Sequence, residues 1–170
     1  MEKLLAYEDR AFADDRVGLA SRFFNCMRIS LDEIPSASVR KQYGATKGPS
    51  ILVLDPSGKE LKRLTGWSTS GSKLYSSMAS VLRSTRKMNL AALLRKENAF
   101  LKRLDDLYWK IEDAKFDRTE LAKRKGKSAE RQMKKLDKGI AVLESQYEQA
   151  KKDEDAFLRK LDGEASAADN

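Results

Sequence analysis

The chain has 170 residues and a formal net charge of +8, with no histidine and one cysteine. The absence of histidine excludes a His-based metal site, a catalytic triad and a histidine pH switch. A single cysteine excludes an intramolecular disulfide and a Cys-x-x-Cys pair within these residues. No apolar run approaches the roughly 20 residues that cross a bilayer. We expect neither a metal nor a cofactor.

The composition changes at about Lys87. All three prolines lie before this residue, whereas the sequence after it is built largely from Leu, Ala, Lys, Glu, Asp and Arg. This change predicts an α/β head over residues 1–86 and a helical arm over residues 87–162. Residues 163–170 are expected to form a disordered tail.

The head begins with a helical pattern over residues 2–23, with a break at 13–15. Asp14 or Asp15 is expected to cap the second of the two helices. Residues 24–31 alternate in polarity, which predicts a strand.

A short helix is predicted over residues 36–43. The continuous apolar run at 50–54 is typical of a central strand that is buried on both faces. Residues 55–58, Asp-Pro-Ser-Gly, predict a turn that leads into a second strand over 60–67. The helix that follows places four apolar side chains on one face. They are Leu74, Met78, Val81 and Leu82.

From Lys87 onward the apolar spacing is that of a coiled coil. Gly126 predicts a helix stop and Ser128 a new N-cap, so the arm is expected to fold back as an antiparallel hairpin with its tip near residues 125–128. The alternative is a long parallel dimer with Gly126 inside it. In the second half the seam is interrupted only by Glu154. Its members are Met133, Leu136, Ile140, Leu143, Tyr147, Ala150, Glu154, Phe157 and Leu161.

The segment from Lys47 to Glu60, Lys-Gly-Pro-Ser-Ile-Leu-Val-Leu-Asp-Pro-Ser-Gly-Lys-Glu, resembles the second half of thioredoxin-like domains. Residues 63–67 are similar to the Gly-aromatic segment that follows in that family, and residues 12–17 are similar to its link between the first helix and the second strand. The resemblance covers about half of the chain. It implies an incomplete thioredoxin-like fold in which Pro49 is the cis-proline; a trans proline that begins a strand is the alternative.

The redox motif of that family has no counterpart here. By the same comparison its Cys-x-x-Cys would fall near residues 1–4, which are Met-Glu-Lys-Leu, and its first strand would precede Met1. Either an upstream segment carries the motif, or the sheet is completed differently, for example by a strand from a partner. Cys26 is expected to be a buried core residue; a reactive thiol or an intermolecular disulfide is the alternative.

The tip of the hairpin is the best interaction candidate. Residues 118–138 contain nine cations and three anions, which leaves a net charge of +6. These cations could bind phosphates or form a solvated surface. The tip residues that we single out are Lys123, Arg124, Lys125, Lys127, Arg131, Lys134 and Lys135. Tyr108, Trp109 and Phe116 are offset from the seam and are expected to form a second apolar stripe.

The function that we favour from the sequence is a non-catalytic interaction or assembly module, with a protein partner or self-association through the coiled coil. One alternative is a thiol-disulfide oxidoreductase whose motif lies upstream of Met1 or is lost. A second is a basic arm that binds nucleic acid or the ribosome. As it stands the chain is expected to be cytoplasmic; an upstream signal peptide would make it periplasmic or exported.

Overall fold

The computed structural model describes residues 2–30, 33–34, 36–43, 48–124 and 126–167. These residues are mostly helical, with one small antiparallel sheet. The chain divides into two compact units, Met1–Leu94 and Arg95–Asn170. The expected boundary after residue 86 coincides with the end of a helix, whereas the division between the units falls after Leu94, inside the next helix.

The first unit begins with α1 (Glu2–Phe12) and α2 (Asp15–Ser21), so the expected break at 13–15 is confirmed. Asp14 is the N-cap of α2, because its carboxylate accepts a hydrogen bond of 3.0 Å from the backbone N–H of Arg16. The Arg16 guanidinium also lies 2.7 Å from this carboxylate. The side-chain hydrogen bond from Arg16 lowers the pKa of Asp14.

The strand predicted over residues 24–31 is wrong for the described part of that range, residues 24–30. These residues contain no strand, and the sheet of the described chain consists of β1 and β2 alone. Alternation of polarity forms a strand only when a neighbouring backbone accepts its hydrogen bonds. Phe24 packs against the core of the unit instead, while Met27 is 83% exposed.

The sheet pairs β1 (Ser50–Leu54) with β2 (Glu60–Thr65) in antiparallel register, with Ile51 opposite Leu64. Both strands and the turn between them are confirmed. The expectation that β1 is buried on both faces is wrong, because none of its residues is fully buried. A strand with one neighbour and helices on one side keeps part of its surface in contact with water.

The turn between the strands is organised by Asp55. Its carboxylate accepts backbone hydrogen bonds of 2.9 Å from both Ser57 and Lys59. The Ser57 hydroxyl also donates to it, at 2.6 Å, and this bond is the largest cause of the lowered pKa of Asp55. The predicted short helix is also present, as α3 (Ala37–Gln42), with Ser36 as its N-cap residue.

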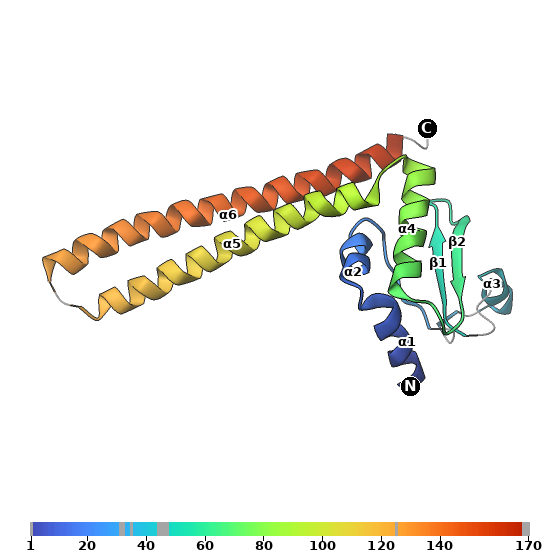
Figure 1. Cartoon of the computed structure of the whole chain (residues 1–170). Helices are drawn as coiled ribbons and strands as arrows, with labels where there is room; N and C mark the ends of the chain where they lie inside the picture. The colour runs from blue at the N-terminus through green and yellow to red at the C-terminus, as the bar shows by residue number, and fades with distance from the viewer. Residues whose placement is uncertain (1, 31–32, 35, 44–47, 125, 168–170) are drawn as a thin grey trace. The chain divides into compact units, whose positions relative to one another are not determined.

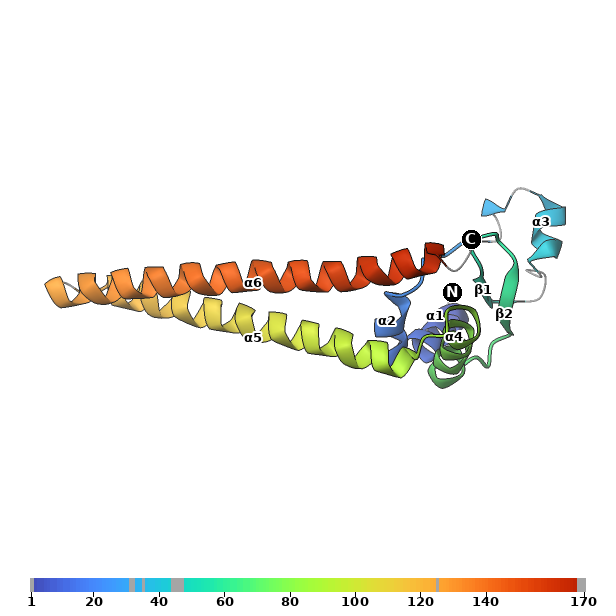
Figure 2. The ribbon, with the colours of Figure 1, turned by 90° about the horizontal axis from the view of Figure 1, so that it is seen from above.

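The core of the first unit is built around α4 (Gly71–Arg86). This helix packs against α1, α2 and β2, and Figures 1 and 2 show it between the α1–α2 pair and the sheet. The close approach to α2 requires a glycine, because a Cβ added at Gly71 would lie 2.5 Å from the Cβ of Asp14. All four apolar residues predicted for one face of this helix are buried. The core consists of Val17, Ala20, Leu74, Met78, Leu82, Leu90 and Leu94.

Trp67, which follows β2, ties α1 to the rest of the unit. Its ring lies edge-on to Tyr7, with 6.0 Å between the centroids, and the Lys3 ammonium lies 4.6 Å from its ring centroid. The guanidinium of Arg10 donates to the Trp67 carbonyl at 3.1 Å. Three residues of α1 therefore contact one residue.

The arm consists of α5 (Leu90–Ala122) and α6 (Lys127–Ala167). The two helices run side by side in opposite directions in both views (Figures 1 and 2), so the antiparallel hairpin is confirmed. Gly126 lies between the two helices and not inside one, as the parallel dimer would require. Gly126 has a φ of +123°, which allows the chain to reverse. Ser128 is not the N-cap, because α6 already begins at Lys127.

The expected disordered tail is also wrong for residues 163–167. Helix α6 continues to Ala167, although Gly163 lies in this stretch. Residues 168–170 lie outside the described residues.

The seam of the hairpin follows the predicted heptads. Leu107, Ile111, Ile140 and Ala150 are buried, and the rings of Phe100 and Phe157 meet across it at 5.5 Å. Glu154 occupies its predicted seam position and is 7% exposed. Ion pairs flank the seam and link the helices at three levels. They join Arg103 to Asp153, Lys115 to Glu144, and Arg118 to Asp137.

Candidate functional site

The outer face of α5, on the side opposite the seam, carries two large aromatic side chains. When the seam residues occupy positions a and d of the heptad, Trp109 and Phe116 both fall at position f. They are 64% and 65% exposed. Tyr108 lies beside Trp109, with 5.5 Å between ring centroids and an interplanar angle of 76°, and is 48% exposed. The structure therefore places all three offset aromatics in contact with solvent.

Carboxylates surround these rings. Positions b, c and f of α5 from residue 105 to 120 hold five acidic residues and no lysine or arginine. We call this surface the acidic-aromatic face. It consists of Asp105, Asp106, Trp109, Glu112, Asp113, Phe116 and Glu120.

Some of these carboxylates have ion-pair partners, and others have none among the described residues. Glu112 lies 3.8 Å from the Lys115 ammonium, and Glu120 pairs with Lys123. Within the described part of the chain, no cation forms an ion pair with the carboxylates at 105, 106 and 113. Three of the five carboxylates on the acidic-aromatic face, beside the exposed rings, therefore lack an ion pair among the described residues.

The outer face of α6 has the opposite charge near the tip. Positions b, c and f from residue 127 to 145 contain five cations and no carboxylate, followed by Val142, which is 57% exposed. None of these cations forms an ion pair with another described residue. We call this surface the basic face. It consists of Lys127, Arg131, Lys134, Lys135, Lys138 and Val142.

The seven tip residues that the sequence singled out divide into two groups. Lys127, Arg131, Lys134 and Lys135 belong to the basic face. Lys123 and Arg124 follow α5 and are exposed, but the Lys123 ammonium already pairs with Glu120. Lys125 lies outside the described residues. The structure thus brings four of the seven together on one side of one helix.

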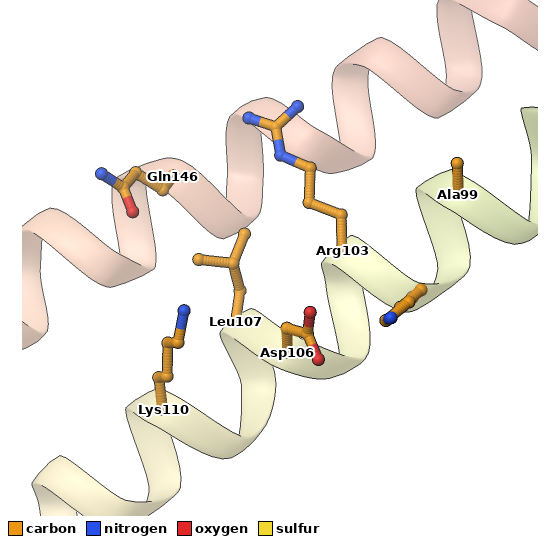
Figure 3. Close-up of a pocket in the computed structure, with 7 residues that line it drawn as sticks. Ala99, Arg103, Asp106, Leu107, Lys110 and Gln146 are labelled. Atoms are coloured by element: carbon orange, nitrogen blue, oxygen red, sulfur yellow. The ribbon is translucent and has the colours of Figure 1, made fainter.

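A shallow groove of about 330 Å³ lies along α5 and reaches α6 at Gln146. Figure 3 shows Leu107 pointing toward α6 between Arg103 and Lys110. The Arg103 guanidinium is held by Asp153 at 3.2 Å. The remaining walls come from Ala99, Lys102 and Asp106. The groove is open and adjoins the acidic-aromatic face through Asp106.

Cys26 is not the core residue that the sequence predicted, because it is exposed. Its thiol lies 3.8 Å from the Ser21 carbonyl oxygen, and partial desolvation raises its pKa above the ordinary value. A raised pKa leaves the sulfur protonated at neutral pH, whereas an activated cysteine has a lowered pKa.

The assignment of Pro49 as a cis-proline is wrong. No peptide bond among the described residues is cis, and the bond between Gly48 and Pro49 is one of them. Pro49 directly precedes β1, where its missing N–H removes no interior ladder bond. The trans alternative therefore describes this residue.

Two further searches bear on function. In the part of the chain that the structure describes, no three His, Cys, Asp or Glu side chains cluster closely enough to bind a metal ion. None of the described helices combines the length and the apolar character that a bilayer crossing requires.

The separation of charge between the two outer faces was not recognised in the sequence. Counting charge along the tip segment gave a net positive value and hid the separation. The heptad positions of the polar residues carry this signal. Comparison of the chain with protein-family models, curated proteins and solved structures finds no match.

Proposed function

We propose that this chain is a non-catalytic protein-interaction or assembly module whose hairpin is the contact arm. The observation that carries the proposal is the exposure of Trp109 and Phe116 on a hairpin whose seam is already filled. These rings contribute nothing to the pairing of α5 with α6. Large aromatic side chains supply much of the binding energy at protein interfaces, whereas on a free surface they expose apolar area to water.

The shape of the arm suits such a role. Helices α5 and α6 have 33 and 41 residues, which at 1.5 Å per residue corresponds to roughly 50 and 60 Å. The apolar seam sets the register of the two helices, and ion pairs flank it. A partner that binds the outer face of α5 therefore meets a preformed surface, which reduces the entropy lost on binding.

The relation of the first unit to thioredoxin-like domains is part of the proposal. It is supported by the order of β1, the Asp55 turn, β2 and α4. The absence of a strand at residues 24–30 and the trans bond before Pro49 do not support it. On this proposal the first unit acts as a binding domain rather than as a redox catalyst, because the single cysteine of this sequence cannot form the dithiol pair that thiol–disulfide exchange in that family requires.

The basic face supports a second candidate function, the binding of an anionic polymer such as a nucleic acid. Its cations are exposed and lack ion pairs among the described residues, as a phosphate-binding surface requires. The other outer positions of α6 from residue 127 to 145 are Ser128, Ala141, Val142 and Ser145. None of them is aromatic, so this surface has no ring on which a nucleic-acid base could stack. Retention on a polyanion column that falls with Lys134→Glu and Lys135→Glu would support this function.

Site-specific photocrosslinking tests the interaction proposal. A photoreactive phenylalanine analogue replaces Phe116 in cells that produce the chain, and a matched sample carries it in place of Lys152, at the corresponding outer position of α6 beyond the basic face. We expect a protein adduct from position 116 and little from position 152. No adduct at 116, or equal adducts at both positions, would contradict the proposal.

A further inference from the structure

We propose that the partner of the arm is a second copy of this chain, with the acidic-aromatic face of one copy docked on the basic face of another. This inference rests on the proposed function and names its partner. It follows from charge complementarity: one face holds only carboxylates among its charged residues, and the other holds only cations. Complementary potentials guide association, whereas two copies of the same face would repel each other.

The two faces also match in spacing. The acidic pairs Asp105–Asp106 and Glu112–Asp113 are one heptad apart, and Arg131 and Lys138 are separated by the same seven residues. One heptad corresponds to about 10.5 Å along a helix. A helix of one copy can therefore align with a helix of another so that cations and carboxylates meet at successive turns.

The aromatic rings give the contact its second component. Trp109 lies between the two acidic pairs, and Phe116 lies between the second pair and Glu120, so a lysine or arginine that reaches those carboxylates passes close to a ring. Its methylene stem covers apolar surface, and its charged head gains a cation–π attraction. The chain already contains such contacts, for example between the Lys151 ammonium and the Tyr147 ring at 4.8 Å.

The placement of the faces determines the kind of assembly. The two faces belong to different helices and each lies opposite the seam, so a copy that has used its acidic-aromatic face still offers its basic face. Such a contact is heterologous, and it continues beyond a dimer unless rotation closes a ring. We therefore expect the average mass to rise with concentration without stopping at two copies.

Two charge-reversed variants of the full chain provide the test. The acid-reversed variant carries Asp105→Lys, Asp106→Lys and Asp113→Lys, and the base-reversed variant carries Lys134→Glu, Lys135→Glu and Lys138→Glu. Lys and Glu are good helix formers, so α5 and α6 are retained, and circular dichroism verifies the helix content. A control variant carries Lys62→Glu, Lys73→Glu and Lys152→Glu, which changes the net charge as much as the base-reversed variant but leaves both faces intact.

Sedimentation velocity over a wide range of protein concentration is the measurement. We expect the wild type and the control to associate, and each reversed variant alone to associate at least about tenfold more weakly. An equimolar mixture of the two reversed variants should recover association, because each face of one is then opposite in charge to a face of the other. The single substitution Asp113→Lys should weaken association to a smaller extent.

Three results would overturn the inference: a monomeric wild type at every concentration, self-association that survives either reversal, or a mixture that does not recover. The photocrosslinking experiment separates this failure from failure of the proposed function. An adduct of Phe116 with a different protein would leave the arm as an interaction module and exclude the second copy. If the wild type stays monomeric and the base-reversed variant loses polyanion binding, the basic face binds an anionic polymer instead.

Discussion

The rings of Phe100 on α5 and Phe157 on α6 lie 5.5 Å apart, with an interplanar angle of 35°. The residues are far apart in the sequence, and this contact places them at the same level of the hairpin. The ion pair between Arg103 and Asp153 lies at nearly the same level. Together the two contacts fix the register in which α5 and α6 pair, and with it the positions of both outer faces.

The register predicts a sharp difference between two neighbouring residues of α6. Ile140 is 8% exposed in the seam, whereas Val142 is 57% exposed. We expect Ile140→Ala to lower the free energy of unfolding of the hairpin by about 2 to 5 kcal/mol, because it leaves a cavity. The matched control Val142→Ala should stay within about 0.5 kcal/mol. Urea unfolding followed by circular dichroism, at low protein concentration, measures the stability of both variants. Equal losses of stability would show that Ile140 does not lie in the seam while Val142 faces outward.

Replacing either of two glycines with alanine should change the stability of the hairpin, but in opposite directions. Gly126 has a φ of +123°, which alanine adopts only under strain, so Gly126→Ala should destabilise the hairpin by about 1 kcal/mol or more. Gly139 lies inside α6 and a Cβ there would contact nothing within 4 Å, so Gly139→Ala should stabilise it by about 0.5 to 1 kcal/mol. Thermal unfolding of the two variants gives the comparison. A stabilising effect at Gly126 would mean that the chain does not reverse there.

The Asp55 turn should weaken in acid. The pKa of Asp55 is lowered in the folded chain, first by the Ser57 hydroxyl. Its contribution to stability is therefore fully present above the unfolded pKa of about 3.9 and is lost as the pH falls through the lower folded value. The difference in unfolding free energy between the wild type and Asp55→Asn should therefore become smaller as the pH falls from about 3.9 through the lower folded pKa. Ser57→Ala should raise the carboxyl pKa in an NMR titration; an unchanged pKa would refute the role of the hydroxyl.

The thiol of Cys26 should be accessible but slow to react. It is exposed, yet its raised pKa keeps the thiolate fraction below that of free cysteine at neutral pH. The rate of reaction with an aromatic disulfide reagent should rise with pH, with a midpoint above that of free cysteine measured in parallel. A midpoint below that of free cysteine would restore the reactive-thiol interpretation.

Sequence patterns predicted those parts of the fold that depend on residues close together in the chain. Heptad spacing located the seam, the Asp-Pro-Ser-Gly sequence located the Asp55 turn, and Gly126 located the reversal. The strand expected at residues 24–31 failed because a strand requires a partner, which alternation of polarity does not reveal. The burial expected for β1 failed for a related reason, since it depends on how many layers cover the sheet.

The candidate site was predictable in part. Trp109 and Phe116 were recognised as offset from the seam, and four of the tip cations do lie on one face. The separation of acidic and basic faces does not appear in the net charge of a segment, because it depends on where each charge lies around its helix. The burial expected for Cys26 depended on the strand expected at residues 24–31, so both expectations failed together.

The quenching of Trp109 by acrylamide tests the central claim, that a second copy of the chain docks on the outer face of α5, most directly. A Trp67→Phe background leaves Trp109 as the only tryptophan, 64% exposed in the isolated chain. We expect the quenching constant to fall as protein concentration rises and to recover in high salt, which screens the charges beside the ring. A quenching constant that stays the same at every protein concentration would show that no second copy covers this face.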